Sequence, residues 1–242
     1  MRVFANMREA ANEIAREIAT RGVRVFVPSV QHVKLEEREE NVTKELLCYS
    51  YKIIDTSDWR EMVKWFRETF PKTLASEEFI EEWFKERISG PKNPELSLLK
   101  YNREYWEKYG LEDDGRFSYT YSERMVYLPL LIDELKRNPR SRQVVLTIFE
   151  TSRDLTNIGK RRIPCSLLYQ LIVRPSLEGD ELWLVYVQRS CDFIKFWPID
   201  VSCAALLKQY VANLLGIKEG PLVHFVTSLH AFIGDIPKER RW

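Results

Sequence analysis

The chain has 242 residues, of which 45% are hydrophobic, so it is long enough to bury a sizeable core. Lysine and arginine number 37 against 36 acidic residues, which gives a formal net charge of +1 at pH 7. This balance argues against a general nucleic-acid-binding or membrane-surface protein, because both classes are clearly basic. We therefore expect no nucleic-acid partner and no membrane partner, although a local anion site is compatible with the composition.

The cysteines are Cys48, Cys165, Cys191 and Cys203, and they show neither the CxxC pairing of metal sites nor a dense disulfide framework. We interpret them as reduced thiols and predict no metal site. The chain does not begin with an apolar signal segment, and no run reaches about 18 apolar residues. These features favour a cytoplasmic protein.

The first half of the chain is predicted to be mainly helical. Apolar residues at Met7, Ala11, Ile14 and Ile18 repeat with helical spacing and predict a helix over 7–20. An alternating, Val-rich stretch predicts one long strand over 23–35. Further helices are predicted over 42–54, 57–70, 76–88, 94–109 and 122–137, the last with Pro129 as a kink position.

The pattern changes after Pro139, where short apolar stretches predict strands over 143–149, 166–173, 181–187 and 222–228. Residues 201–215 are strongly apolar and contain no Gly or Pro, so we predict a buried helix. Helices followed by strands around one central helix indicate an α+β fold, with a mixed β-sheet, a buried central helix and flanking helices. No internal repeat or linker is visible, and we predict a single domain over 1–242.

Cys165 is the first candidate for chemistry. It follows Lys160, Arg161 and Arg162 and precedes a predicted strand. Nearby cations stabilise a thiolate, and a thiolate is a good nucleophile for covalent catalysis. A small buried side chain at the start of a strand is the commoner explanation of such a cysteine. The residue alone leaves both interpretations open.

Two motifs together resemble the active site of the thymidylate synthase family, which includes the deoxycytidylate hydroxymethylases. They are Arg162-Ile163-Pro164-Cys165 and Gln188-Arg189-Ser190-Cys191-Asp192, with Asp200 eight residues further on. Members of the family attach a one-carbon unit to C5 of a pyrimidine nucleotide. The resemblance implies a thymidylate synthase-like α+β fold, covalent addition of Cys165 to C6 of the ring, and 5,10-methylenetetrahydrofolate as the cofactor. In the family His often follows the nucleophile, whereas this chain has Ser166.

The resemblance also implies how a pyrimidine nucleoside monophosphate is held. Gln188, Arg189 and Ser190 match substrate-binding positions, and arginine suits a phosphate because its guanidinium can bind two oxygens at once. Arg142 matches an arginine that family dimers lend to the partner's site, so we expect a homodimer. His230 matches the residue that binds the ribose 3′-hydroxyl, and Asp192 matches a position that serves catalysis and the folate.

Asp200 discriminates between the candidate substrates. The matching residue is Asn in thymidylate synthases and Asp in deoxycytidylate hydroxymethylases. An Asn amide can donate to uracil O4, whereas an ionised Asp only accepts, which suits the N4 amino group of cytosine. Asp200 could equally cap the helix predicted over 201–215, and the two roles are compatible.

Three further residues match the family more loosely. Lys44-Glu45-Leu46-Leu47 resembles a His-Glu-Leu-Leu segment whose Glu organises proton transfer, although an exposed helical Glu would look the same. In the segment 115–121, Tyr119 is our choice for the Tyr that assists proton removal from C5, with Tyr121 as the alternative. Trp106 has the spacing of a tryptophan that packs against the folate, and a core aromatic residue fits it as well.

We therefore predict a folate-dependent enzyme of this family, favoured as a deoxycytidylate 5-hydroxymethylase because of Asp200. The alternative is an archaeal-type thymidylate synthase that methylates deoxyuridylate, because Tyr119-Thr120-Tyr121 resembles that branch. A third hypothesis is a non-catalytic member that binds nucleotide or RNA.

Overall fold

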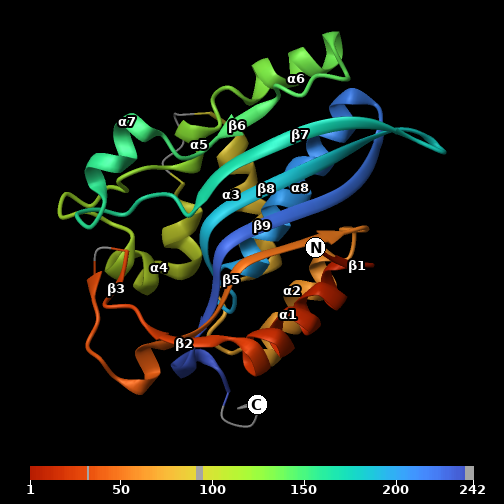
Figure 1. Cartoon of the computed structure of the whole chain (residues 1–242). Coiled ribbons are helices and arrows are strands. Elements are labelled where there is room, and N and C mark those ends of the chain that lie inside the picture. Colours follow the sequence, from red (N-terminus) through yellow and green to blue (C-terminus); the bar gives the residue numbers. More distant parts are fainter. Residues whose placement is uncertain (32, 91–94, 238–242) are drawn as a thin grey trace.

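The computed structural model describes residues 1–31, 33–90 and 95–237 (Figure 1). Within these ranges the chain forms a seven-stranded mixed sheet and a separate two-stranded hairpin, with helices packed mainly on one face of the sheet. The predicted α+β class is confirmed. None of the helices in this part of the chain combines the length and apolar character needed to span a bilayer.

The strands of the large sheet come from both halves of the chain. They are β1 (Arg2–Phe4), β2 (Val23–Phe26), β5 (Val42–Ile53), β6 (Val145–Thr147), β7 (Ser166–Ser176), β8 (Gly179–Asp192) and β9 (Lys218–Phe232). Their order is β1-β5-β9-β8-β7-β6, and β2 pairs with β5. The separate hairpin consists of β3 (Ser29–Val30) and β4 (Val33–Lys34).

The helices include one long, buried helix. They are α1 (Met7–Arg21), α2 (Trp59–Thr69), α3 (Glu77–Ile88), α4 (Ser97–Tyr109), α5 (Tyr121–Arg124), α6 (Leu128–Arg137), α7 (Thr151–Asp154) and α8 (Trp197–Leu215). The buried helix is α8, which connects the parallel strands β8 and β9 and packs against both of them and against α2 and α3. A parallel pair needs such a crossover, so the apolar stretch predicted as a buried helix is confirmed.

The core contains a buried polar network of Tyr51, Trp197 and His224, none of which lines the cavity described below. Tyr51 lies at its centre, because its hydroxyl accepts a bond from Trp197 Nε1 at 2.7 Å and lies 2.6 Å from His224 Nδ1. Burial lowers the pKa of His224 to about 3, so its ring is neutral at physiological pH. This histidine therefore has a structural role in the core.

The prediction of a helix over 42–54 is wrong. These residues form β5, which pairs with β9 along most of its length and also with β1 and β2. Thr43, Tyr51 and Ile53 are buried on it, and β-branched and aromatic side chains of this kind favour strands. Pairing with partners far away in the sequence outweighs the helical propensity of Lys44-Glu45-Leu46-Leu47. The expected order of helices first and strands later is wrong for the same reason.

Two other predicted elements are interrupted. The long strand over 23–35 is broken into β2, β3 and β4, with Pro28 between the first two and Gln31 at a positive φ of 54°. The helix over 122–137 is two helices, α5 and α6, and Pro129 lies in the first turn of the second, where a missing backbone N–H is harmless. The start predicted at Pro94 lies outside the described residues, and α4 begins at Ser97.

Two aspartates close to helix starts do not cap those helices with their side chains. Asp58 precedes α2 but makes no side-chain bond to it; instead its carboxylate accepts the backbone N–H groups of Met7 and Arg8, both at 2.9 Å, at the start of α1. Asp200 does not cap a helix over 201–215, because α8 begins earlier, at Trp197, and places Asp200 in its first turn. The cap role considered for Asp200 is therefore wrong, and its carboxylate is available for other contacts.

Candidate active site

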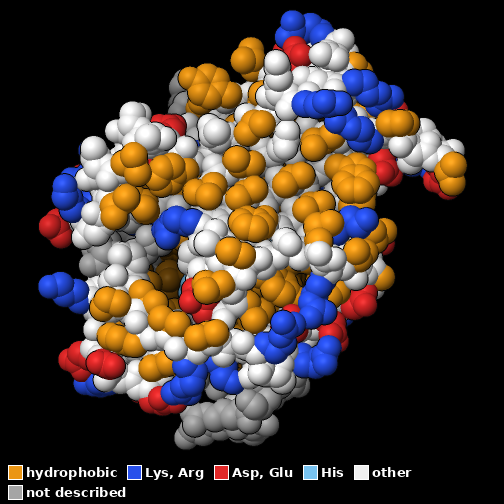
Figure 2. All heavy atoms as spheres, in the orientation of Figure 1, with side chains coloured by type: hydrophobic (Ala, Val, Ile, Leu, Met, Phe, Trp, Pro, Cys, Tyr) orange, Lys and Arg blue, Asp and Glu red, His pale blue; other side chains and the backbone are white. Residues whose placement is uncertain are grey.

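A cavity of about 1150 Å³ opens at the ends of β5, β8 and β9, next to the β3–β4 hairpin and α4. A hollow at this place is visible to the left of centre in Figure 2. The residues singled out from the sequence that line it include Glu45, Trp106, Tyr119, Tyr121, Cys165, Arg189, Ser190, Asp192, Asp200 and His230. Gln188 lies behind the wall, fully buried, and Arg142 lies outside the cavity, exposed to solvent.

The Cys165 thiol is half-buried and faces two nitrogen donors. Arg189 Nη2 lies 3.6 Å from the sulfur, and Gln31 Nε2 lies 3.8 Å from it. Arg189 is fixed in turn by the loop that carries the thiol, because its Nε donates to Pro164 O at 2.9 Å and its Nη2 to Ile163 O at 3.2 Å. A fixed guanidinium therefore places positive charge next to the candidate nucleophile. Gln31 has no motif around it in the sequence, and the turn between β3 and β4 brings it to the site.

Ser166, directly after the candidate nucleophile, belongs to a buried hydroxyl network. Its Oγ lies 2.9 Å from the Tyr121 hydroxyl and 2.6 Å from the Tyr186 hydroxyl. The hydroxyl of Tyr121 is therefore engaged in this network. The Tyr119 ring instead lies 4.2 Å below the Arg162 guanidinium. Burial raises the pKa of Tyr119 to about 12, against the opposing charge of Arg162, so this phenol is neutral and able to donate a proton.

Asp200 lies on the floor of the cavity and is 5% exposed. Gln188 Nε2 donates to Asp200 Oδ2 at 2.8 Å, so Gln188 supports Asp200 from behind the cavity wall. Arg87 Nη2, from α3, lies 3.7 Å from Oδ1. Burial raises the pKa of Asp200, while the positive charge of Arg87 opposes that rise. Arg87 was not identified from the sequence, where it is one of many charged residues on an amphipathic helix.

Glu45 and His230 are neighbours across two strands, since they are paired in the β5–β9 register. Ser228 links them: its hydroxyl donates to Glu45 Oε1 and lies 3.3 Å from His230 Nδ1. The strand position of β5, and not a helix, brings the Glu45 carboxylate to the cavity. A carboxylate, a hydroxyl and an imidazole in line can bind a sugar hydroxyl or pass a proton.

Asp192 is fixed at the end of β8 by a tight turn. Its Oδ1 accepts the backbone N–H of Ile194 at 3.0 Å and of Lys195 at 3.1 Å. The Lys195 ammonium lies 3.6 Å from Oδ2 and also pairs with Asp235. Lys195 lines the cavity and was missed in the sequence, because the motif ends at Asp192.

Trp106 both lines the cavity and belongs to the core, being 3% exposed and packed edge-on against Tyr105, Phe117 and Phe196. Its Nε1 is buried without a hydrogen-bond partner among the described residues. This orphaned donor, the aromatic wall and the nearby Asp192 carboxylate fit a flat, nitrogen-rich ring. The cavity volume also exceeds what one nucleotide-sized ligand needs. The residues present therefore fit a nucleotide together with a folate.

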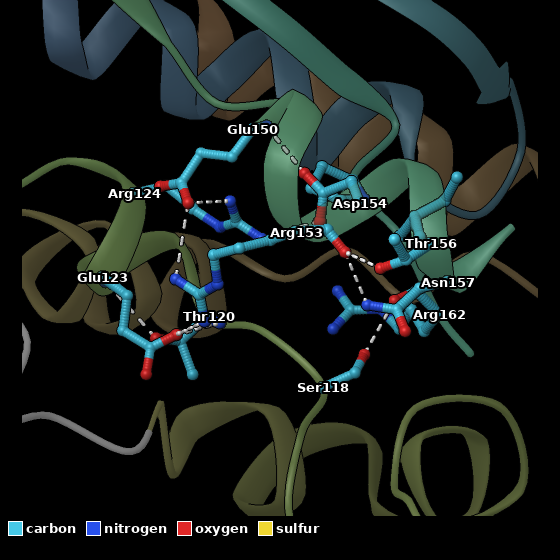
Figure 3. Close-up of polar contacts among 12 residues, drawn as sticks. Ser118, Thr120, Glu123, Arg124, Glu150, Arg153, Asp154, Thr156, Asn157 and Arg162 are labelled. Atoms are coloured by element: carbon cyan, nitrogen blue, oxygen red, sulfur yellow. Dashed lines mark hydrogen bonds and ion pairs between the residues drawn. The ribbon is translucent and has the colours of Figure 1, made fainter. Parts of the chain in front are cut away.

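The segments that carry Tyr119 and Cys165 are tied together by buried polar contacts, which Figure 3 shows. Arg124 is 2% exposed, and its guanidinium lies 2.8 Å from Asp154 Oδ1 and 2.9 Å from Glu150 Oε2. Ser118 Oγ donates to the backbone oxygen of Arg162 at 2.7 Å. These contacts join α5 to α7 and to the loop before β7, so they set the separation of the phenol and the thiol.

A family model with the description "Thymidylate synthase" matches residues 65–239, which is more than half of the chain. The chain belongs to the thymidylate synthase family. The match includes Cys165, Arg189, Asp192, Asp200 and His230, whereas Glu45 and Gln31 lie before it. Among the described residues, no group of three or more His, Cys, Asp or Glu side chains is placed to hold a metal ion.

Curated relatives are similar over parts of their length. The thymidylate synthase of Equine herpesvirus 2 is 35% identical over 106 residues, which are 44% of this chain and 34% of the viral protein. The bifunctional dihydrofolate reductase-thymidylate synthase of Leishmania amazonensis is 27% identical over 191 residues, 74% of this chain and 35% of that protein. The thymidylate synthase of Ascaris suum is 26% identical over 163 residues, 67% of this chain and 51% of that protein. The chain thus spans about a third to a half of these relatives.

The buried Arg124 pair generates a prediction for stability. Arg124→Met leaves the Asp154 carboxylate buried without its cation, so we expect the free energy of unfolding to fall by about 3–5 kcal/mol. The matched control is Arg153→Met, because Arg153 also pairs with Glu150 but is half-exposed, and there we expect a loss below about 1 kcal/mol. Urea denaturation followed by circular dichroism measures both. Equal losses in the two variants would contradict the role given to Arg124.

Proposed function

We propose that this chain is a folate-dependent enzyme that transfers a one-carbon unit to C5 of a pyrimidine nucleoside 5′-monophosphate. The observation that carries the proposal is the Cys165 thiol, 3.6 Å from Arg189 Nη2 in a cavity whose polar wall includes Asp200, Asp192 and His230.

The residues divide the chemistry between them. The Cys165 thiolate adds to C6 of the pyrimidine, and the ring electrons move to C5, which becomes nucleophilic. Arg189 lies beside the sulfur, and Arg189 with Ser190 offers donors for the phosphate. His230 is placed for the sugar hydroxyl. Tyr119 and Glu45 are the groups available to move the proton at C5.

The folate, when bound, supplies the one-carbon unit. Trp106 and the neighbouring aromatic wall would hold it, with Asp192 as its polar contact. Asp192 is held in place by two backbone N–H groups, so its carboxylate is already oriented before any ligand arrives. The four cysteines are free thiols, which is compatible with the cytoplasmic location that we propose.

For the substrate we favour deoxycytidylate, and for the activity a deoxycytidylate 5-hydroxymethylase. The support is the buried Asp200 carboxylate, which is bonded to Gln188 on one oxygen and paired with Arg87 on the other side. An ionised carboxylate accepts a hydrogen bond from the cytosine amino group. Opposite uracil it would face O4, which is also an acceptor, so no hydrogen bond would form. The second candidate is a thymidylate synthase acting on deoxyuridylate, which the names of the curated relatives favour.

We also propose a homodimer in which Arg142 reaches the partner's cavity. The face of β7, β8 and β9 opposite α8 carries a row of partly exposed apolar side chains, and Figure 2 shows hydrophobic side chains gathered there. The row consists of Leu168, Ile172, Trp183, Val185, Val187, Val223 and Phe225. The exposed Arg142 lies beside this face, because its backbone oxygen accepts a bond from Gln170 at 3.0 Å.

The first prediction concerns the nucleophile. Cys165→Ala should lower turnover by at least about 10³-fold, because the covalent step is lost, while nucleotide binding persists. The assay incubates the protein with methylenetetrahydrofolate and each of four pyrimidine monophosphates (dCMP, dUMP, CMP and UMP), and identifies the products by mass. The exposed Cys48 provides the control variant Cys48→Ala, which should keep full activity. Turnover that survives in Cys165→Ala would refute covalent catalysis.

The second prediction concerns the base. Asp200→Asn gives the site an amide that can donate to O4, so the ratio of kcat/KM for dCMP over dUMP should fall by at least about tenfold. Asp133→Asn, on the exposed surface of α6, removes the same charge far from the cavity and should leave the ratio unchanged. A ratio that is the same in Asp200→Asn and wild type would remove the substrate argument.

The third prediction concerns assembly. Val185→Glu puts a charge in the middle of the apolar face and should raise the dimer dissociation constant by at least about 100-fold, since an unpaired charge would be buried. Leu177→Glu, at the fully exposed β7–β8 turn, is the control and should leave the dimer intact. Sedimentation velocity measures both. A fully active wild-type monomer would contradict the lending of Arg142.

A further inference from the structure

A buried arginine lies directly behind the carboxyl that we assign to reading the base. Arg87 is 2% exposed, and its guanidinium is stacked 3.6 Å from the centre of the Trp83 ring and 3.9 Å from that of Tyr121. Its Nη2 lies 3.7 Å from Asp200 Oδ1, too far for an ordinary hydrogen bond but close enough for a strong charge interaction. Its Nε and Nη2 have no hydrogen-bond partner within the described part of the chain.

Arg87 is the principal counter-charge of Asp200, and it also opposes the rise that burial causes in the pKa of the buried Glu95. Burial raises the pKa of Asp200, and Arg87 is the strongest influence in the opposite direction, ahead of the Gln188 bond and of Arg162. The other titratable groups that face it are Tyr121, Tyr169, Tyr186, Cys191 and Cys203. Burial raises the pKa of each of these phenols and thiols, so all of them are neutral at physiological pH.

The charge of Asp200 decides which base its side chain can match. An ionised carboxylate offers only acceptors, the pattern that suits the cytosine amino group. A protonated carboxyl donates through its O–H and accepts through its C=O. That is the donor and acceptor pattern of an Asn amide, and it suits uracil O4 and N3–H. The same residue can therefore select either base, according to whether it holds a proton.

We propose that Arg87 is a positioning residue that sets base specificity, because its buried guanidinium keeps Asp200 ionised and so makes the site match cytosine. This inference rests on the proposed function, since it takes Asp200 to meet the edge of the pyrimidine. At a distance of 3.7 Å, Arg87 acts on Asp200 through its charge. A cation is therefore required at this place, whereas the shape of the guanidinium is not.

Two substitutions separate charge from packing. Arg87→Met keeps a long apolar stem between Trp83 and Tyr121 but removes the charge, and Arg87→Lys keeps the charge. Calorimetric binding of dCMP and dUMP between about pH 5 and about pH 8 gives the preference as a function of pH. At neutral pH the dCMP preference should fall by at least about tenfold in Arg87→Met, recover as the pH rises, and stay close to wild type in Arg87→Lys.

The control is Lys85→Met, which removes an exposed charge from the same helix and should leave the preference and its pH profile unchanged. In an Asp200→Asn background, Arg87→Met should no longer alter the preference, because no titrating carboxyl remains to be controlled. A merely structural role of Arg87 would instead weaken the binding of both nucleotides equally at every pH, in both backgrounds, and that result would overturn the proposal.

A second readout needs no nucleotide. Infrared difference spectra against Asp200→Asn follow the carboxylic acid band of Asp200 as the pH is varied. This band should appear at higher pH in Arg87→Met than in wild type, and an unchanged titration would overturn the proposal. If Arg87→Met does not fold, Arg87→Lys still tests the charge: its dCMP preference and the pH at which the Asp200 band appears should stay close to wild type, and a clear shift of either would overturn the proposal.

The failures are distinguishable. A wild-type protein that binds neither dCMP nor dUMP would refute the proposed function, and with it the role of Arg87 in base choice. A wild-type protein that prefers dCMP, with the same preference and pH profile in Arg87→Met, would refute the inference about Arg87 and leave the proposed function standing.

Discussion

The site depends on one constraint, the pairing of β7 with β8 immediately after the candidate nucleophile. Ser166 is paired with Gln188, and the Arg189 backbone N–H donates to Cys165 O at 2.9 Å. This register places the Arg189 guanidinium against the loop carbonyls and the sulfur on one side of the strand. On the other side it points Gln188 into the core, where it reaches Asp200. Because side chains alternate along a strand, a slip by one residue would exchange the two and separate the thiol from its cation.

Around this hairpin the fold buries charges in pairs. Asp200 lies on the floor of the cavity with Arg87 behind it, and Asp154 with Arg124 ties α5, which follows Tyr119, to α7. Buried pairs of this kind are often no more stabilising than apolar residues of the same size, because both ions lose their water. Their value lies in orientation and in charge state. Arg87 and Asp200 are 3.7 Å apart, so this pair mainly affects the charge state of the carboxyl. Arg124 and Asp154 are 2.8 Å apart, so this pair mainly orients the segments that it joins.

The sequence revealed the parts of the site that are local in the chain. Cys165, Arg189 and Asp192 lie at the ends of two adjacent strands, so a motif could identify them together, and α8 was visible as an apolar stretch. β5 was mispredicted because its partners β9, β1 and β2 are distant in sequence, whereas Lys44-Glu45-Leu46-Leu47 favours a helix locally. Gln31, Arg87 and Lys195 were missed for a related reason. Each is an ordinary polar residue in its own segment and gains a role only from what the fold places against it.

The two walls of the cavity have different relations to the family. The residues proposed for bond formation lie in the matched span 65–239, whereas Gln31 and Glu45 come from the segment before it. That segment is not remote from the chemistry, because Gln31 Nε2 lies 3.8 Å from the Cys165 sulfur and Glu45 is paired with His230. Any molecule that reacts with the thiol must therefore fit against the β3–β4 hairpin. Cys165 and Arg189 lie in the matched wall, and the shape of the cavity depends also on the unmatched one.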